Sequence, residues 1–203
     1  MVRIKKIKTS DLNFNIDSNI LDLPKKKYEY LNKIYEWTGG KRMKLLYRGS
    51  RDGTSCKKFH EKCDNETSTI CLYKNEKDNI FGGYTKFQWT SPSSRTYFPD
   101  EYSFLFTLSN IYDIEPTKFP ILNCDRSTRH DCNDGPTFGG NPSKSGNPDL
   151  GVYADYIKER CYSGFPESYK DILGKGRSIF TSNKDNKENY FKVKEIEVFK
   201  IFN

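Results

Sequence analysis

Short runs of apolar residues, separated by clusters of turn residues, fill the sequence from Arg42 to its end. Such runs are typical of β-strands, each with one buried face. The expected strands are 44–48, 69–74, 80–89, 103–109, 118–123, 150–156 and 190–201. Strands and helices do not alternate regularly, which favours antiparallel over parallel pairing. The sequence therefore predicts a mainly β (α+β) fold, a sandwich of two antiparallel sheets with a few flanking helices.

The last expected strand changes its pattern halfway along. Phe191 and Val193 lie on one side of an extended chain, whereas Ile196 and Val198 lie on the other. An extra residue in one strand of a pair reverses this parity. We therefore predict a β-bulge near Lys194, which would bring all four apolar side chains to one face.

The N-terminal segment is basic. Residues 1–27 carry seven cations and three acidic residues, a local charge of +4 in a chain whose formal charge is +7. Residues 1–21 are expected to form a flexible tail, because termini order only where something ties them down. We also expect the fold to survive the loss of residues 1–20.

An amphipathic helix is expected within residues 22–41, over about 23–38. Asp22 is the candidate N-cap, Pro24 lies in the first turn and Gly39 ends the helix. Apolar residues recur between them at helical spacing, at Tyr28, Leu31, Ile34 and Tyr35. Because this stripe needs a partner, the helix is expected to dock on the following domain, residues 42–203.

A second helix is expected inside the strand region. Cys56, Phe59, His60 and Cys63 are spaced so that all four face the same way on a helix. The two cysteines would lie ~10 Å apart along it, too far for a disulfide. Cys63 is then either a redox thiol, with its pKa lowered by His60 and Lys62, or a packed apolar residue. The strong tendency of cysteine to be buried favours the second interpretation.

Other chemistries find little support in the sequence. Cys124, His130 and Cys132 lack the ligand spacing of a closed zinc site, so no metal is expected. No glycine-rich loop matches a nucleotide-binding motif, so no cofactor is expected, and no nucleic-acid recognition module is visible. The first residues are not followed by the apolar run of a signal peptide, which favours an intracellular protein with reduced thiols.

Six short motifs follow one another along residues 42–202. They are Leu45–Ser55, Phe59–Asp64, Ile80–Tyr84, Phe104–Leu108, Gly135–Gly140 and Phe191–Phe199. In this order and at this spacing they resemble the TLDc domain, found in oxidation resistance proteins, and the chain looks like the stand-alone TLDc proteins of protists. The resemblance implies a sandwich of two antiparallel sheets flanked by short helices.

The resemblance also implies a function. TLDc proteins are linked to resistance against oxidative stress, and several bind the peripheral sector of the vacuolar proton-pumping ATPase. No catalytic centre is established for the family. The implied protein is thus a non-catalytic binding module in the cytoplasm, peripheral to vacuolar or endosomal membranes.

The matched positions carry over as family-motif residues, most with an expected structural role. They are Asp52, Gly53, Ser55, Phe59, Phe81, Gly82, Phe138, Gly139, Gly140, Glu195 and Glu197. The glycines would permit turns that a side chain blocks, and Asp52 and Ser55 would cap the helix bearing Cys63. The link at 141–148 looks longer than is usual in the family. The resemblance therefore does not indicate whether the chain has a contact surface near this link.

Two alternatives from other classes remain open. A thiol-dependent antioxidant enzyme would use Cys63, and would need that thiol to be exposed with a lowered pKa. A basic module would instead make a weak contact with acidic membrane lipids through residues 1–27, at about 1 kcal/mol per cation near the surface.

Overall fold

The computed structural model describes residues 12–141, 146–153, 155, 161–185 and 187–203. Within them the helices are α1 (Lys27–Thr38), α2 (Gly49–Asp52), α3 (Cys56–Cys63) and α4 (Ser178–Thr181), with a 3-10 turn at Cys124–Arg126. The strands are β1 (Arg42–Arg48), β2 (Thr69–Asn75), β3 (Ile80–Thr85), β4 (Thr96–Phe98), β5 (Phe104–Ser109), β6 (Thr117–Pro120), β7 (Thr128–His130), β8 (Cys161–Tyr162), β9 (Tyr190–Phe191) and β10 (Val193–Phe202).

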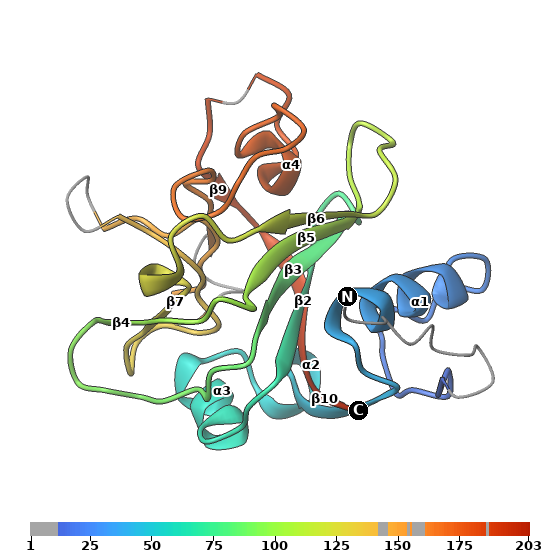
Figure 1. The fold of residues 1–203 in the computed structure, drawn as a ribbon, viewed down its shortest axis with the longest axis horizontal. Coiled ribbons are helices and arrows are strands. Elements are labelled where there is room, and N and C mark those ends of the chain that lie inside the picture. The colour runs from blue at the N-terminus through green and yellow to red at the C-terminus, as the bar shows by residue number, and fades with distance from the viewer. Residues whose placement is uncertain (1–11, 142–145, 154, 156–160, 186) are drawn as a thin grey trace, which may run out of the picture.

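A six-stranded antiparallel sheet organises the fold. Its strand order is β1-β10-β2-β3-β5-β6, and the pairs β4-β7 and β8-β9 form two further small sheets. In Figure 1, α1 lies on one side of the central sheet and the β4-β7 pair on the other. The expected mainly β fold with antiparallel sheets and few helices is confirmed, and the second layer is built from short ribbons and loops.

The central sheet is buried on both faces. One face packs with α1 into a cluster that includes Leu31, Ile34, Phe106 and Phe199. The opposite face packs with α3, α4 and the loops into a second cluster. In β5, Phe104, Phe106 and Leu108 belong to the first cluster and Leu105 to the second. The expectation of one buried face per strand is therefore wrong for this strand, because each face has its own cover.

The predicted bulge in the last strand is confirmed. The register of β10 against β2 shifts between Val193 and Glu195. As a result Val193, Ile196 and Val198 all pack in the cluster on the α3 side of the sheet. The extra residue reconciles the two halves of the pattern, as expected for a bulge.

Several strand ends differ from the sequence prediction. The strand expected over 80–89 ends at Thr85, because the Asp100 carboxylate accepts hydrogen bonds from Thr85 Oγ1 and Lys86 N. The strand expected at 118–123 ends at Pro120. In the described part of 150–156, the chain forms isolated bridges instead of a continuous ladder.

The expected N-terminal helix is present but begins later. Its N-cap is Lys26 and not Asp22, because Lys26 N and Lys27 N both donate to the Leu23 carbonyl and form a separate turn first. The helix ends as predicted, with Gly39 in the left-handed conformation at φ +74°. Leu31, Ile34 and Tyr35 of its expected apolar stripe are fully buried, but Tyr28 is 63% exposed, so the stripe was predicted wrongly at its first residue.

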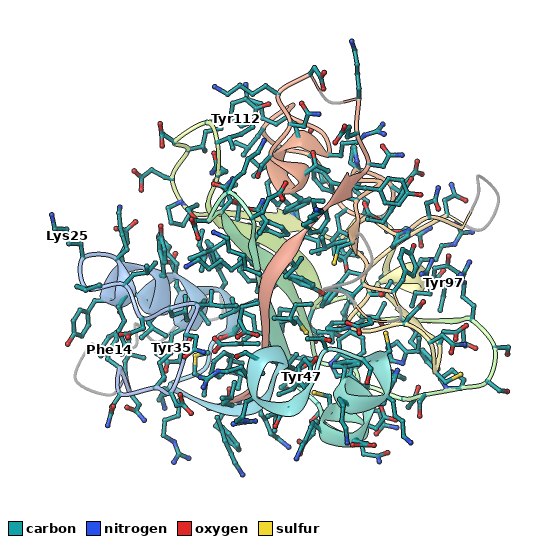
Figure 2. The ribbon with its side chains drawn as sticks, turned by 180° about the vertical axis from the view of Figure 1, so that it is seen from behind. Phe14, Lys25, Tyr35, Tyr47, Tyr97 and Tyr112 are labelled. Atoms are coloured by element: carbon teal, nitrogen blue, oxygen red, sulfur yellow. The ribbon has the colours of Figure 1, made fainter. Side chains whose placement is uncertain are left out.

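The segment before α1 is packed against the domain from residue 12 onward. Ile20 and Leu21 are fully buried, and the Tyr35 hydroxyl donates to the Asn13 carbonyl at 2.5 Å. Figure 2 shows Phe14 next to Tyr35 of α1, and their ring centroids are 6.3 Å apart. Deleting residues 1–20 would therefore remove part of a core. The prediction of a flexible tail, where it concerns residues 1–11, lies outside the described residues.

Among the described residues, no helix has both the length and the apolar character that a membrane crossing requires.

Gly82 lies where β3 crosses closely between its neighbours. A Cβ built there would meet the Cys71 carbonyl oxygen at 1.8 Å and the Phe106 ring at 2.9 Å. We expect Gly82→Ala to lower the free energy of unfolding by about 3 kcal/mol or more, because the strand must shift to admit a methyl group. Urea unfolding of the full chain measures this loss.

Gly39→Ala is the control. Its φ is +74°, but nothing lies within 4 Å of the added methyl group, so only the left-handed backbone costs energy, about 1 kcal/mol. Equal losses in the two variants would contradict the close-packing explanation.

Candidate functional site

Glu197 is a buried carboxylate that joins three parts of the chain. It is fully inaccessible to solvent and accepts hydrogen bonds from Ser18 Oγ at 2.5 Å, Asn19 N at 2.8 Å and Arg48 Nε at 2.6 Å. Arg48 also binds Asp17 through Nη2 at 2.7 Å. A buried charge is costly unless it is paired and hydrogen-bonded. The carboxylate therefore fixes the N-terminal segment and β1 to β10.

Glu195 anchors the neighbouring short helix in the same way. Its carboxylate accepts from Ser50 N at 3.1 Å and from the Ser50 hydroxyl, so α2 is tied to β10. The Asp52 carboxylate accepts from Arg48 N at 2.9 Å and pairs with Arg51. The hydrogen bond from Arg51 lowers the pKa of Asp52. These contacts close the turn between β1 and α2.

The expected capping of α3 by Asp52 and Ser55 is wrong. Ser55 occupies the N-cap position with extended backbone, but within the described residues no side chain caps this helix. Thr54 instead donates to the Asp155 carboxylate at 2.5 Å. Gly53 has φ +104°, and its carbonyl accepts from the Tyr47 hydroxyl at 2.8 Å. Asp52 and Gly53 thus shape the turn before α3. Neither residue caps the first turn of that helix.

The helical spacing of cysteine and aromatic residues on α3 is confirmed. Cys56, Phe59, His60 and Cys63 are all buried. Phe59 packs edge-on against Trp89, with ring centroids 5.3 Å apart. The stripe therefore faces the core, as its periodicity indicated.

Cys63 has the surroundings of a packed residue. Its side chain is fully buried, and burial raises the pKa of the thiol well above its ordinary value. His60 Nδ1 lies 2.7 Å from the Asp64 carboxylate, and Nε2 lies 2.9 Å from the Asp134 carbonyl oxygen. The ring thus has its own partners on both sides. The geometry supports the packed interpretation over the redox one.

Cys124, His130 and Cys132 differ sharply in exposure. Cys124 and Cys132 are exposed, whereas His130 is buried and lies within hydrogen-bond distance of Thr90 at one ring nitrogen and Thr128 at the other. Burial lowers the pKa of His130 to about 3, so the ring is neutral. Across the described residues, no three or more His, Cys, Asp or Glu side chains gather to hold a metal ion.

The glycine pair 139–140 forms a corner around a buried carboxylate. Gly139 and Gly140 have φ +68° and +125°, which confirms the expected turn. A Cβ on Gly139 would lie 2.0 Å from the Asp149 carboxylate. That carboxylate accepts from Gly140 N at 3.1 Å and Ser168 N at 2.9 Å. Burial raises the pKa of Asp149 to about 7, against the lowering effect of its backbone donors.

The remaining motif residues pack the core. Phe81 stacks on Tyr73 with ring centroids 5.9 Å apart, and Phe138 packs edge-on against Trp89 at 5.7 Å. Gly82 stands in a strand and serves close approach, not a turn. Together with the anchors above, these contacts give the family-motif positions a shared structural role.

Sequence reasoning missed the partners of these carboxylates. Arg48, which pairs with Glu197, lies inside the first motif, and the Asp149 carboxylate lies nine residues after Gly140. Nothing in their local pattern shows that they are buried. Glu197 stands between Ile196 and Val198, and this alternation places it on the solvent side of a strand with one buried face. The local pattern therefore gave no signal that Glu197 is buried.

These features define a class, a mainly β module whose motif residues hold a two-sided sheet and its corners together. The sequence matches the TLDc domain over residues 14–202, and the chain therefore belongs to the TLDc domain family. The match includes α1 and most of the described segment before it. No individual curated protein is similar enough to be named as a relative.

Removal of the Glu197 carboxylate tests the anchor. We expect Glu197→Ala to lower the free energy of unfolding by about 3 to 5 kcal/mol, because Arg48 is left buried beside fewer acceptors. Urea unfolding measures the change. Glu61→Ala removes a solvent-exposed partner of Lys58 and should have little effect. A similar small effect for both variants would argue against the anchoring role.

Thiol labelling tests the state of Cys63. Under native conditions, iodoacetamide should modify the exposed Cys124 and Cys132 rapidly and Cys63 only after unfolding, because a buried thiol with a raised pKa supplies little thiolate. Mass spectrometry of peptides identifies the labelled positions. Rapid labelling of Cys63 in the folded protein would instead support the redox enzyme.

Proposed function

We propose that this TLDc domain is a non-catalytic binding module that associates with the peripheral sector of the vacuolar proton-pumping ATPase and thereby contributes to oxidative-stress resistance. The observation that carries the proposal is membership of the TLDc family over residues 14–202. The resemblance described above links such domains to this ATPase and to oxidative stress.

The geometry of the motif residues is compatible with a binding role. Glu195 and Glu197 fix α2 and the N-terminal segment to the sheet, and Gly139 and Gly140 shape a corner around Asp149. A rigid scaffold of this kind positions loops for recognition. The partner then contacts the loops and surface residues, while the motif residues maintain their positions.

The thiol enzyme receives less support than binding, since Cys63 is packed inside the core. The contact with acidic lipids remains a supplementary proposal. It depends on the cations in residues 1–27, and four of these precede the described segment. Lys25 projects from the loop that leads into α1 (Figure 2) and is exposed. Such exposed charges act mainly on encounter and are screened beyond ~8 Å at physiological ionic strength.

Affinity purification from the cell that makes this protein tests the proposal. The tagged full chain should co-purify with subunits of the peripheral ATPase sector. The double variant Gly139→Val and Gly140→Val should lose them, because β-branched residues disfavour positive φ and the corner unfolds. Deletion of residues 1–11, which spares the packed segment, should weaken binding modestly and reduce its salt dependence.

The matched control is Lys184→Ala, which changes an exposed lysine outside the motif blocks and should retain the subunits. Failure of the folded full chain to co-purify with the ATPase, or to alter its activity, would overturn the proposal.

A further inference from the structure

A cavity of about 350 Å³ opens on the face of the central sheet that α1 covers only in part. Its walls include four aromatic side chains and two lysines, from Trp37, Tyr84, Tyr102, Phe104, Lys86 and Lys118. Tyr84 and Phe104 each lie at the end of one of the six motifs, and the other four residues lie outside them. Cavities of roughly 300 to 1,000 Å³ are the size that ligand sites usually have.

The cavity arises because the sheet extends beyond the end of the helix. Tyr84 pairs with Phe104 in the β3-β5 ladder, so Lys86 and Tyr102 follow on the same face two residues further along. Helix α1 ends at Thr38. The ring of Trp37 in its last turn lies 6.3 Å from that of Phe104, and beyond this contact the sheet face is open.

Two ammonium groups lie over aromatic rings in this cavity. Lys86 Nζ is 3.6 Å from the centroid of the Tyr102 ring, and Lys118 Nζ is 4.9 Å from that of Phe104. Neither lysine forms an ion pair in the part of the chain that the structure describes, and Glu101 is the one acidic residue in the lining there. A ring holds the ammonium in place but leaves N–H donors for an incoming carboxylate.

Apolar surface continues beyond the cavity. Tyr102 is 55% exposed and Leu122 is 64% exposed. Phe104 pairs with Pro120 in the β5-β6 ladder, so Tyr102 and Leu122 leave the sheet at the same end. This rim extends the surface further than a small ligand in the cavity would cover.

We propose that this cavity binds an acidic peptide segment of a partner protein. One large apolar side chain of the peptide enters between Trp37 and Tyr102, and flanking carboxylates pair with Lys86 and Lys118. The charge of the lining, two cations to one acid, selects against basic segments. The first eleven residues of the chain itself carry four cations and one acid, and are therefore a poor match. The proposal does not depend on association with the ATPase.

Fluorescence of Trp37 provides a direct test on the full chain. The other tryptophan, Trp89, is 1% exposed in the core and gives a constant background. The probes are blocked hexapeptides in which one phenylalanine or leucine is flanked by aspartate and glutamate, with lysine-flanked and serine-flanked peptides for comparison. We expect saturable binding of the acidic series, at least ~10-fold tighter than that of the lysine-flanked series, since ~1.4 kcal/mol corresponds to tenfold.

Variants locate the site. Lys86→Glu with Lys118→Glu should weaken binding of the acidic peptides at least ~10-fold. Lys184→Glu is the matched control, because Lys184 also lies over a tyrosine ring, that of Tyr112, outside the cavity. It should leave the affinity unchanged. Trp37→Phe should abolish the fluorescence change while calorimetry still detects binding. Urea unfolding of each variant confirms that its fold is intact.

Three outcomes would overturn the proposal. In the first, the acidic peptides bind no more tightly than the lysine-flanked ones, or the double variant binds them as well as the unaltered chain does. In the second, Trp37 emission changes with protein concentration and no peptide affects it, which assigns the cavity to a second copy of the chain. In the third, phenylacetate binds as tightly as the best peptide, which assigns it to a small aromatic acid.

Discussion

The buried carboxylate of Glu197 is the interaction on which the arrangement of this domain depends. An ionised carboxylate inside a protein is tolerated only where cations and donors surround it. Here the donors come from residues 18–20, before the first helix, and the cation is Arg48, at the end of β1. Both must reach β10, near the C-terminus, for the charge to be satisfied. The interaction thus joins the segment before α1 to the last strand, and both lie within the family match over residues 14–202.

A second carboxylate organises the opposite side of the sheet. Asp149 is fully buried and receives backbone donors from Gly140, Glu167 and Ser168. Since a Cβ at Gly139 would occupy the position of this carboxylate, the glycine and the acid depend on each other. Corners made in this way hold long irregular segments without regular ladders. This explains how loops and two-stranded ribbons can cover one face of the six-stranded sheet.

The sequence predicted those elements whose cause is local. The cysteine and aromatic spacing of α3, the reversal of parity at Lys194 and the stop at Gly39 each depend on neighbours within a few residues. The start of α1 was placed wrongly because a turn at Leu23 precedes the helix, and β3 was made too long because Asp100 binds its end. Strands β4 and β7 were missed because each is only three residues long.

The candidate site shows the same division between local and distant causes. The motif positions could be identified from the sequence, but the bonds of Glu197 to Ser18 and Asn19 join residues far apart in the chain. Periodicity carries no information about such contacts. It places Glu197 on the opposite face from Ile196 and Val198, and that face is buried here only because α1 and the segment before it cover it. The cavity between Trp37 and Tyr102 was missed for the same reason, because its residues come from α1 and three separate strands or their ends.

The contrast between the motif residues and the cavity bears on how recognition is encoded in this domain. Phe59, Phe81 and Phe138 are enclosed in the core, so a change at these positions acts on a partner through the stability of the fold. Lys86 and Tyr102 are exposed, and a change there alters the charge and shape of the surface with little effect on packing. If the proposed peptide site is right, substitutions at such exposed positions would change which peptide is bound, while the enclosed aromatic residues continue to hold the fold.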